Sequence, residues 1–470
     1  MHPILEKTVQ QVAAHYGVAG GAVVVVKDGK TILKEPFGLA DASTGRPVTA
    51  QSYFDIASNS KAFTTMLWSM MCDVGKAAWD TPIRKWWPGF KMVDEYAAAH
   101  LTARDMACHR SGLSRHDLIR RSHLQDLPSR QDYVERIAHY VPSAGFREKH
   151  QYQNQVYAAL GYLEEQISGM TWEEMVRDWI AKPLDMEVEF RGLTDLAGKD
   201  AALPHKGDGA KPEVRDYNMC WVNNPCGGIK TNLDSMEKWV HMLADGGVYP
   251  NGERFISEQQ YKELCSGVIA AGAGQSWNPL DKAASYGLGW KVSAYRGHKL
   301  VQHGGSIQGF NSNVGFFPEL GIGYAVMVNA DGTCLHEVLR YLLCDYGLDC
   351  LREDYSDLLE IHLKKRGRPL RERIKNWPKL PVSAAEAARF AGHYWNDGYH
   401  DLYVEADARP GLTVVYGPDK AELHQVEEGV FQGVFEECGI FADCRFAPDG
   451  RTAIMSYSEK YSPTLFHKVK

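Results

Sequence analysis

The chain has 470 residues, and its 59 aspartate and glutamate residues exceed its 52 lysine and arginine residues, a formal net charge of −7. Its 44% hydrophobic and 24% charged content is typical of a soluble globular protein, and the acidic balance argues against a nucleic-acid partner. No run of about 18 apolar residues exists, so no membrane span is predicted, and we see no signal peptide. Ten scattered cysteines without a CxxC pair suit reduced thiols, so we expect a cytoplasmic protein.

The first predicted elements are a short amphipathic helix over residues 4–13 and a β-hairpin. In the hairpin, residues 23–26 and 31–33 flank Asp28-Gly29, a pair that favours a type I′ turn. A helix over residues 62–74 follows, because its apolar residues recur at helical spacing.

Residues 100–250 are mostly helical in pattern, and strands return over residues 286–295, 299–305 and 312–330, with a turn at 318–321. Because strands stand on both sides of the helical region, we expect the first and last of them to pair. The predicted fold class is α+β: an antiparallel sheet flanked by helices plus an all-helical subdomain, followed by a small all-β barrel.

Changes in composition predict three parts: a first domain over residues 1–350, a linker over 351–383 and a β-barrel domain over 384–470. The linker is basic and rich in proline, and we interpret it as a solvated, partly helical connector rather than as a site for an anionic partner. The last part shows partial alternation of apolar and polar residues between Pro-Gly and Asp-Gly turns, which favours short strands.

Three short motifs carry candidate chemistry: Ser58-Asn59-Ser60-Lys61, Tyr152-Gln153-Asn154 and His303-Gly304-Gly305. A serine and a lysine three residues apart share one face of a helix, which places an amine beside a hydroxyl. Each motif alone is weak evidence, since the chain holds a second SxxK at Ser235-Met236-Glu237-Lys238. There, Asp234 or Ser235 fits better as a helix N-cap.

The order and context of the motifs resemble the serine β-lactamase-like hydrolases, in the branch of class C β-lactamases, D-aminopeptidases and esterases. FDIASNSKAFTT (54–65) is similar to the nucleophile segment of that family, and LTARDMACHRSGL (101–113) to its LLxHxSGL stretch. NPCGGIKTNLDSMEKWVHML (224–243) resembles its GGLxST..D helix entry, and YGLGW and HGGSIQGFNS its closing strands. The C-terminal part more weakly resembles a lipocalin-like barrel that covers the cleft in some relatives.

The resemblance implies roles for seven residues besides His303. Ser58 would attack an amide or ester, and a hydroxyl needs a base to do so at neutral pH. Lys61 and Tyr152 would move the protons, and Asn154 would hold Lys61 and bind a substrate carbonyl. The backbone N–H groups of Ser58 and Ser306 would hold the oxyanion, while Gly304 and Gly305 would let the strand edge approach the substrate.

Two departures and several alternatives bear on the substrate. His303 replaces the lysine with which many relatives grip a substrate carboxylate, which argues against β-lactam hydrolysis. Gln153 stands where relatives have a small residue, and we expect it to point away from the site; His109 is expected to be structural. The substrate is predicted to be a small molecule or short peptide, perhaps with D-residues. A carboxylesterase or lactonase, and a binding protein without turnover, stay open as alternatives.

The sequence also predicts what the protein does not use. It contains no HExxH, no paired CxxC and no glycine-rich phosphate loop, so we expect no metal and no nucleotide cofactor. The oligomeric state is left open, a homo-oligomer included.

Overall fold

The computed structural model describes residues 1–470 except 116–128, 193–195, 197, 208, 210, 218–220, 250, 272–277, 366–378, 407–410, 418, 436–439, 457–462 and 470. The chain forms two compact units. The first comprises Met1–Trp87, Thr102–His109 and Tyr157–Lys365, and the second comprises Pro88–Leu101, Arg110–Val156 and Arg366–Lys470.

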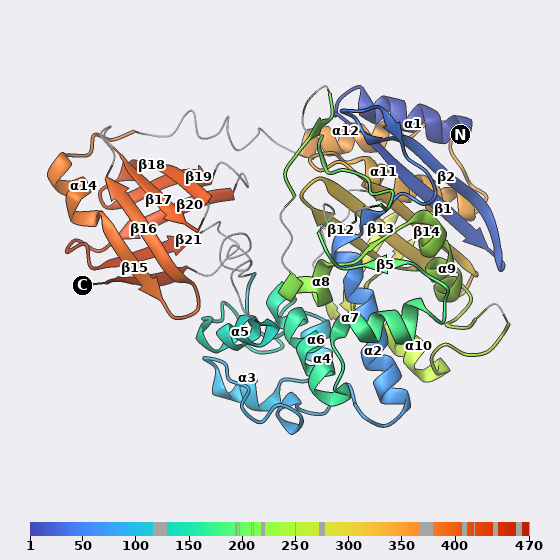
Figure 1. Ribbon diagram of the computed structural model, residues 1–470, viewed down its shortest axis with the longest axis horizontal. Helices are drawn as coiled ribbons and strands as arrows, with labels where there is room; N and C mark the ends of the chain where they lie inside the picture. The colour runs from blue at the N-terminus through green and yellow to red at the C-terminus, as the bar shows by residue number, and fades with distance from the viewer. Residues whose placement is uncertain are drawn as a thin grey trace. The chain divides into compact units, whose positions relative to one another are not determined.

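An antiparallel sheet organises the first unit (Figure 1). Among the described residues nine strands follow one another in space: β3 (Arg46–Pro47), β2 (Lys30–Asp41), β1 (Gly20–Lys27), β14 (Ile322–Val328), β13 (Phe310–Phe317), β12 (His298–Ile307), β11 (Lys291–Tyr295), β10 (Asp281–Gly287) and β9 (Gly267–Ala270). The predicted pairing of the first and last strands is confirmed, because β1 pairs with β14 from Gly21↔Val328 to Lys27↔Ile322. The predicted hairpin is also confirmed, with positive φ at both Asp28 and Gly29 as a type I′ turn needs.

Helices cover both faces of this sheet. Adding a Cβ at Gly323 would bring it against Val240 of α9 (Leu233–Ala244), whereas Gly347 of α11 (Leu335–Gly347) lies against Ile322. Successive residues of a strand point to opposite faces, so α9 and α11 lie on opposite sides of β14. The continuous apolar run of β1 follows from this arrangement, since a strand covered on both faces needs apolar residues at every position.

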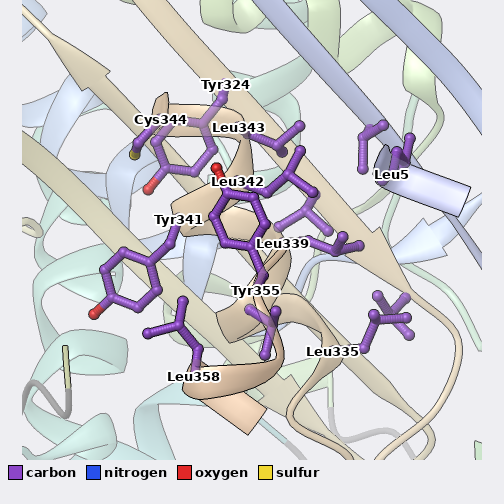
Figure 2. Close-up of a cluster of buried hydrophobic side chains, with 14 of the residues drawn as sticks. Leu5, Tyr324, Leu335, Leu339, Tyr341, Leu342, Leu343, Cys344, Tyr355 and Leu358 are labelled. Carbon is purple, nitrogen blue, oxygen red and sulfur yellow. The ribbon is translucent and has the colours of Figure 1, made fainter. Parts of the chain in front are cut away.

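The core on the α11 side also contains α1 (Pro3–Ala13) and α12 (Ser356–Lys365). Figure 2 shows Leu5 of α1, Leu358 of α12 and leucines of α11 in one buried cluster with Tyr324 of β14. The predicted N-terminal helix is therefore confirmed, and Leu5 and Val12 on its apolar stripe are buried. The helix α12 falls within residues 351–383, whose residues 366–378 lie outside the described part. The division into domains at 350 and 383 stays a prediction.

A buried carboxylate ties the end of α11 to the sheet and to the segment after it. Asp345 is fully buried and accepts hydrogen bonds from the Tyr295 hydroxyl (2.7 Å), the Tyr355 hydroxyl (2.9 Å) and the Arg296 Nε (2.6 Å). Removing one partner of a buried ion pair leaves the other charge without compensation.

We therefore expect Asp345→Asn to lower the free energy of unfolding by about 3 kcal/mol. Urea unfolding followed by tryptophan fluorescence would measure the change. The matched control is Asp349→Asn four residues later, whose side chain is 78% exposed and pairs with Lys27 at the surface. A surface ion pair contributes up to about 1 kcal/mol, so the control should unfold close to wild type. Equal midpoints for the two variants would contradict the anchoring role of Asp345.

The first unit also contains the long helix α2 (Ser60–Asp73), which is buried on nearly every side. The predicted helix at 62–74 thus begins two residues earlier. Further short helical elements of the first unit are η1 (Ala57–Asn59), η2 (Ile83–Lys85), α4 (Ala103–Ala107), α7 (Trp172–Met175), η5 (Val176–Ala181), η7 (Trp221–Asn223), α8 (Asn224–Gly227) and α10 (Glu258–Leu264). Two small sheets are also present in the described residues. One consists of β4 (Phe54–Asp55), β8 (Lys230–Thr231) and β5 (Val188–Glu189), in that order, and the other of β6 (His205–Lys206) and β7 (Glu213–Val214).

The second unit contains a closed β-barrel, which confirms the predicted all-β C-terminal part. Its strands in the described ranges are β15 (Gly392–Asn396), β16 (His400–Ala406), β17 (Leu412–Tyr416), β18 (Asp419–Glu427), β19 (Val430–Phe435), β20 (Ile440–Phe446), β21 (Thr452–Ser456) and β22 (Thr464–Lys468). Helix α14 (Ala384–Phe390) precedes them and stacks Phe390 on Phe446, with ring centroids 4.6 Å apart. Large buried side chains such as Tyr394, Phe431 and Phe466 fill the interior, as expected of an eight-stranded barrel.

The same unit includes short helical elements before residue 156: α3 (Glu95–His100), α5 (Arg130–Glu135), η4 (Arg136–His139) and the start of α6 (Asn154–Ser168). The barrel contacts them through its first hairpin. The rings of Tyr399 and Tyr140 lie 5.3 Å apart, and Arg136 Nη2 lies 3.4 Å from His400 Nδ1. Across the described residues of both units, no helix is both long enough and apolar enough to cross a bilayer.

Candidate active site

The candidate nucleophile lies on a tight turn between β4 and α2. Ser58 is partly exposed although its neighbours are buried. Ala57 has a φ of 47°, a left-handed conformation that is uncommon for a residue with a side chain. Two hydrogen bonds hold this turn: the Ala57 N–H donates to Asp55 Oδ1 (2.7 Å), and the Ser60 hydroxyl donates to the Ala57 carbonyl oxygen (2.8 Å).

Lys61 lies one helical turn after Ser58 and is fully buried. Its Nζ is 3.2 Å from Ser58 Oγ and 2.6 Å from the carbonyl oxygen of Cys226 in α8. The amine also faces the ring of Tyr157, whose centroid is 5.3 Å away. The structure thus brings the amine and the hydroxyl together as the spacing predicts, and it fixes the amine with a backbone acceptor that is distant in sequence.

The second SxxK sequence has a different environment. In α9 the side chains of Ser235 and Lys238 bond to other groups: Ser235 Oγ accepts from the Glu187 N–H (2.8 Å), and Lys238 Nζ donates to Asp185 Oδ2 (2.5 Å). The predicted N-cap at Asp234 or Ser235 was wrong. Asn232 caps the helix, since its side chain accepts from the Ser235 N–H, and the helix begins earlier than the apolar pattern indicates.

The strand β12 carries His303, Gly304, Gly305 and Ser306. Its pairing with β11 runs from His298 to Gln302, so in the described registers residues 303–307 pair with β13 alone. Ser306 is exposed on this part of the strand. An unpaired strand edge presents backbone N–H groups outward, which is what an oxyanion site needs.

Gly305 brings this strand against the nucleophile turn. A Cβ at this position would lie 2.2 Å from the Ile56 carbonyl oxygen and 2.3 Å from Ser312 Oγ. Ser312 Oγ in turn donates to the Ile56 carbonyl oxygen and accepts from Asn59 Nδ2, both at 2.8 Å. The glycine therefore permits close packing of β12 on the turn that carries Ser58.

His303 is buried, and both of its ring nitrogens face groups of the same unit. Nδ1 lies 2.7 Å from the Gly304 carbonyl oxygen, which can only accept, so Nδ1 is assigned the proton. Nε2 lies 2.8 Å from the Tyr286 hydroxyl. These contacts hold the imidazole within the protein, where a lysine would instead offer a fixed positive charge.

Aromatic contacts that the sequence did not predict connect Lys61 with His303. The His109 ring lies 5.0 Å from the Tyr157 ring and 4.9 Å from the Tyr286 ring. Tyr157 faces Lys61, and the Tyr286 hydroxyl lies next to His303 Nε2. The contacts of the His109 ring with these two tyrosines therefore connect the lysine to the strand β12. Tyr286 belongs to YGLGW, for which the sequence predicts only a strand. His109 is fully buried between the two rings, in agreement with its expected structural place.

Tyr152 and Asn154 belong to the second unit and are described within it. Tyr152 is half-buried, with the Arg115 guanidinium carbon 5.7 Å from its ring centroid. Gln153 is buried and donates from Nε2 to the Ser114 carbonyl oxygen (2.8 Å). Asn154 is the first residue of α6, which continues into the first unit with Tyr157 one turn later.

Comparison with known proteins identifies the family. A model of the beta-lactamase family matches residues 5–343. The chain belongs to the beta-lactamase family. The relatives of this beta-lactamase-family protein include the unguisins hydrolase ungD' of Aspergillus campestris, 26% identical over 96% of this chain and 88% of that protein. A D-aminopeptidase of Brucella anthropi is 28% identical over 65% of this chain and 55% of that protein.

Solved structures share the fold over the whole length of this beta-lactamase-family chain. The octameric penicillin-binding protein homologue from Pyrococcus abyssi aligns with a TM-score of 0.62 and 19% identity, covering 98% of this chain and 99% of that one. SurE aligns with a TM-score of 0.60 and 20% identity, covering 99% and 98%. The predicted fold class, an α+β domain of the β-lactamase type followed by a barrel, is confirmed.

Proposed function

We propose that this beta-lactamase-family protein is a serine hydrolase that cleaves small peptides or amides through an acyl-enzyme at Ser58. The observation that carries the proposal is the distance of 3.2 Å between Lys61 Nζ and Ser58 Oγ, with Lys61 buried and Ser58 partly exposed. A nucleophile within hydrogen-bond reach of its base is the arrangement that acyl transfer needs.

In the proposed acylation, Lys61 Nζ accepts the Ser58 proton as Oγ bonds to the substrate carbonyl carbon. The carbonyl oxygen becomes an oxyanion, which the N–H groups of Ser58 and Ser306 stabilise. The tetrahedral intermediate then expels the amine, which takes a proton delivered through Tyr152. Water attacks the acyl-enzyme by the same route in reverse and releases the acid.

Asn154, Tyr152 and the three residues before Ser306 keep their predicted roles in this proposal. Asn154 would bind Lys61 and the substrate carbonyl, and Gly304 and Gly305 would let β12 approach. The internal contacts of His303 support substrates that do not depend on a gripped carboxylate, which disfavours β-lactams. Two relatives, named an unguisins hydrolase and a D-aminopeptidase, support a hydrolase, and the second name supports peptide substrates with D-residues.

The test is intact-protein mass spectrometry after a fluorophosphonate probe, on wild type and on Ser58→Ala. We expect one adduct in wild type and none in the variant. Turnover of D- and L-aminoacyl amides then tests the substrate class. Fast hydrolysis of p-nitrophenyl acetate with no amide turnover would favour a carboxylesterase or lactonase instead. No adduct and no turnover would favour a binding protein. Light scattering after size-exclusion chromatography tests the homo-oligomer.

A further inference from the structure

A fully buried ion pair lies beside the turn that carries Ser58. Asp55 of β4 and Lys230 of β8 are paired across the small sheet, and both side chains are 0% exposed. Lys230 Nζ lies 3.5 Å from Asp55 Oδ2. Burying two opposite charges is costly unless further hydrogen bonds satisfy them, so each atom of the pair should have additional partners.

Those partners exist, and two of them are backbone groups next to the site. Asp55 Oδ1 accepts the Ala57 N–H at 2.7 Å, and Lys230 Nζ donates to the Gly228 carbonyl oxygen at 3.1 Å. The Tyr217 hydroxyl donates to Asp55 Oδ2. Burial and the neighbouring carboxylate hold the pKa of Tyr217 well above its usual range, so this hydroxyl stays protonated and remains a donor.

Each of the two backbone groups belongs to a segment that positions one reacting atom. Ala57 precedes Ser58 and adopts the left-handed φ of 47°, a conformation that persists only where its surroundings hold it. Gly228 is two residues after Cys226, whose carbonyl oxygen accepts from Lys61 Nζ. The two segments also touch, since a Cβ at Gly227 would lie 3.7 Å from the Ala57 carbonyl carbon.

We propose that Asp55 and Lys230 are positioning residues that set the distance between Ser58 Oγ and Lys61 Nζ. Asp55 holds the turn that presents the hydroxyl, Lys230 holds the loop that orients the amine, and their ion pair joins the two. The Tyr217 hydroxyl supplies a further hydrogen-bond donor to Asp55. This inference rests on the proposed function, because it gives the pair a role in acylation of Ser58.

The test compares the rate at which a fluorophosphonate phosphonylates Ser58 with loss of fluoride, taken as the measure of acylation, with the reversible affinity for the probe in folded variants. We expect Asp55→Ala to acylate about a hundredfold more slowly with little change in affinity, because misplacing a reacting group by about 1 Å costs about that much. Asp55→Asn should acylate about tenfold faster than Asp55→Ala, since its amide oxygen still accepts a hydrogen bond from the Ala57 N–H. Lys230→Met and Tyr217→Phe should also slow acylation.

Controls separate positioning from stability and from the proposed function itself. Asp345→Asn loses stability elsewhere in the same unit, so at a temperature where it is folded it should acylate at the wild-type rate. Wild-type acylation rates in folded Asp55→Asn and Tyr217→Phe would overturn the inference while leaving the proposed function intact. A loss of acylation rate in Asp345→Asn as large as that in the Asp55 variants would do the same. Absence of labelling in wild type would instead overturn the proposed function. If Asp55→Ala does not fold, the Asn and Phe variants decide.

Discussion

Lys61→Met is expected to slow acylation of Ser58 by about a thousandfold. The methionine side chain fills a similar space but cannot accept the serine proton, and a positioned general base contributes about 10²–10⁴-fold. The helix α2 should keep its place, because the variant keeps an apolar side chain there while losing polar contacts of Nζ, among them those to Ser58 and Cys226. The measurement is the pseudo-first-order rate of adduct formation with a fluorophosphonate, followed by intact mass.

The chain supplies a matched control in its second SxxK sequence. Lys238 is partly exposed and bonds to Asp185 at the surface, and Ser235 Oγ accepts the Glu187 N–H. Lys238→Met and Ser235→Ala should therefore leave the acylation rate unchanged, although Ser235→Ala removes one hydrogen bond and should cost about 1 kcal/mol of stability. An adduct that forms in Lys61→Met as fast as in wild type would exclude Lys61 as the base.

The comparison of these two SxxK sequences shows what the sequence could predict. The approach of Ser58 and Lys61 depends on residues three apart, and helix geometry fixes it locally. The pairing of β1 with β14 was likewise predictable, because both are long apolar runs that need cover on two faces. Context, rather than the motif, distinguished the two serines, since only Ser58 opens a helix that is buried on nearly every side.

The parts that could not be predicted depend on backbone atoms far away in the chain. The acceptor of Lys61 is the carbonyl oxygen of Cys226, and the residue type at a position says nothing about a carbonyl group. The predicted strand over 286–295 was wrong in its middle, where residues 288–290 bend between β10 and β11. Gly289 adopts a φ of 83° there, and a Cβ would lie 2.8 Å from Thr65 Oγ1, a contact that only the folded chain creates.

Gly305→Ala is expected to lower kcat/KM by about a hundredfold and the free energy of unfolding by about 2 kcal/mol. The added methyl group would lie 2.2 Å from the Ile56 carbonyl oxygen, a backbone atom that cannot rotate away. To relieve this clash, β12 would have to move away from the nucleophile turn. The Ser306 N–H would then lie farther from the Ser58 N–H. The measurements are steady-state kinetics on the best amide of the substrate panel and urea unfolding.

The neighbouring glycine provides the comparison that isolates this close approach. A Cβ at Gly304 would meet Asn313 Nδ2 at 3.5 Å, an ordinary van der Waals distance, so Gly304→Ala should lose far less activity than Gly305→Ala. Both variants add the same methyl group to the same strand, so loss of glycine flexibility would affect them alike. Similar losses in the two variants would therefore contradict the packing argument. A large loss at Gly305 alone would show that the Ile56 contact sets the spacing of the two N–H donors.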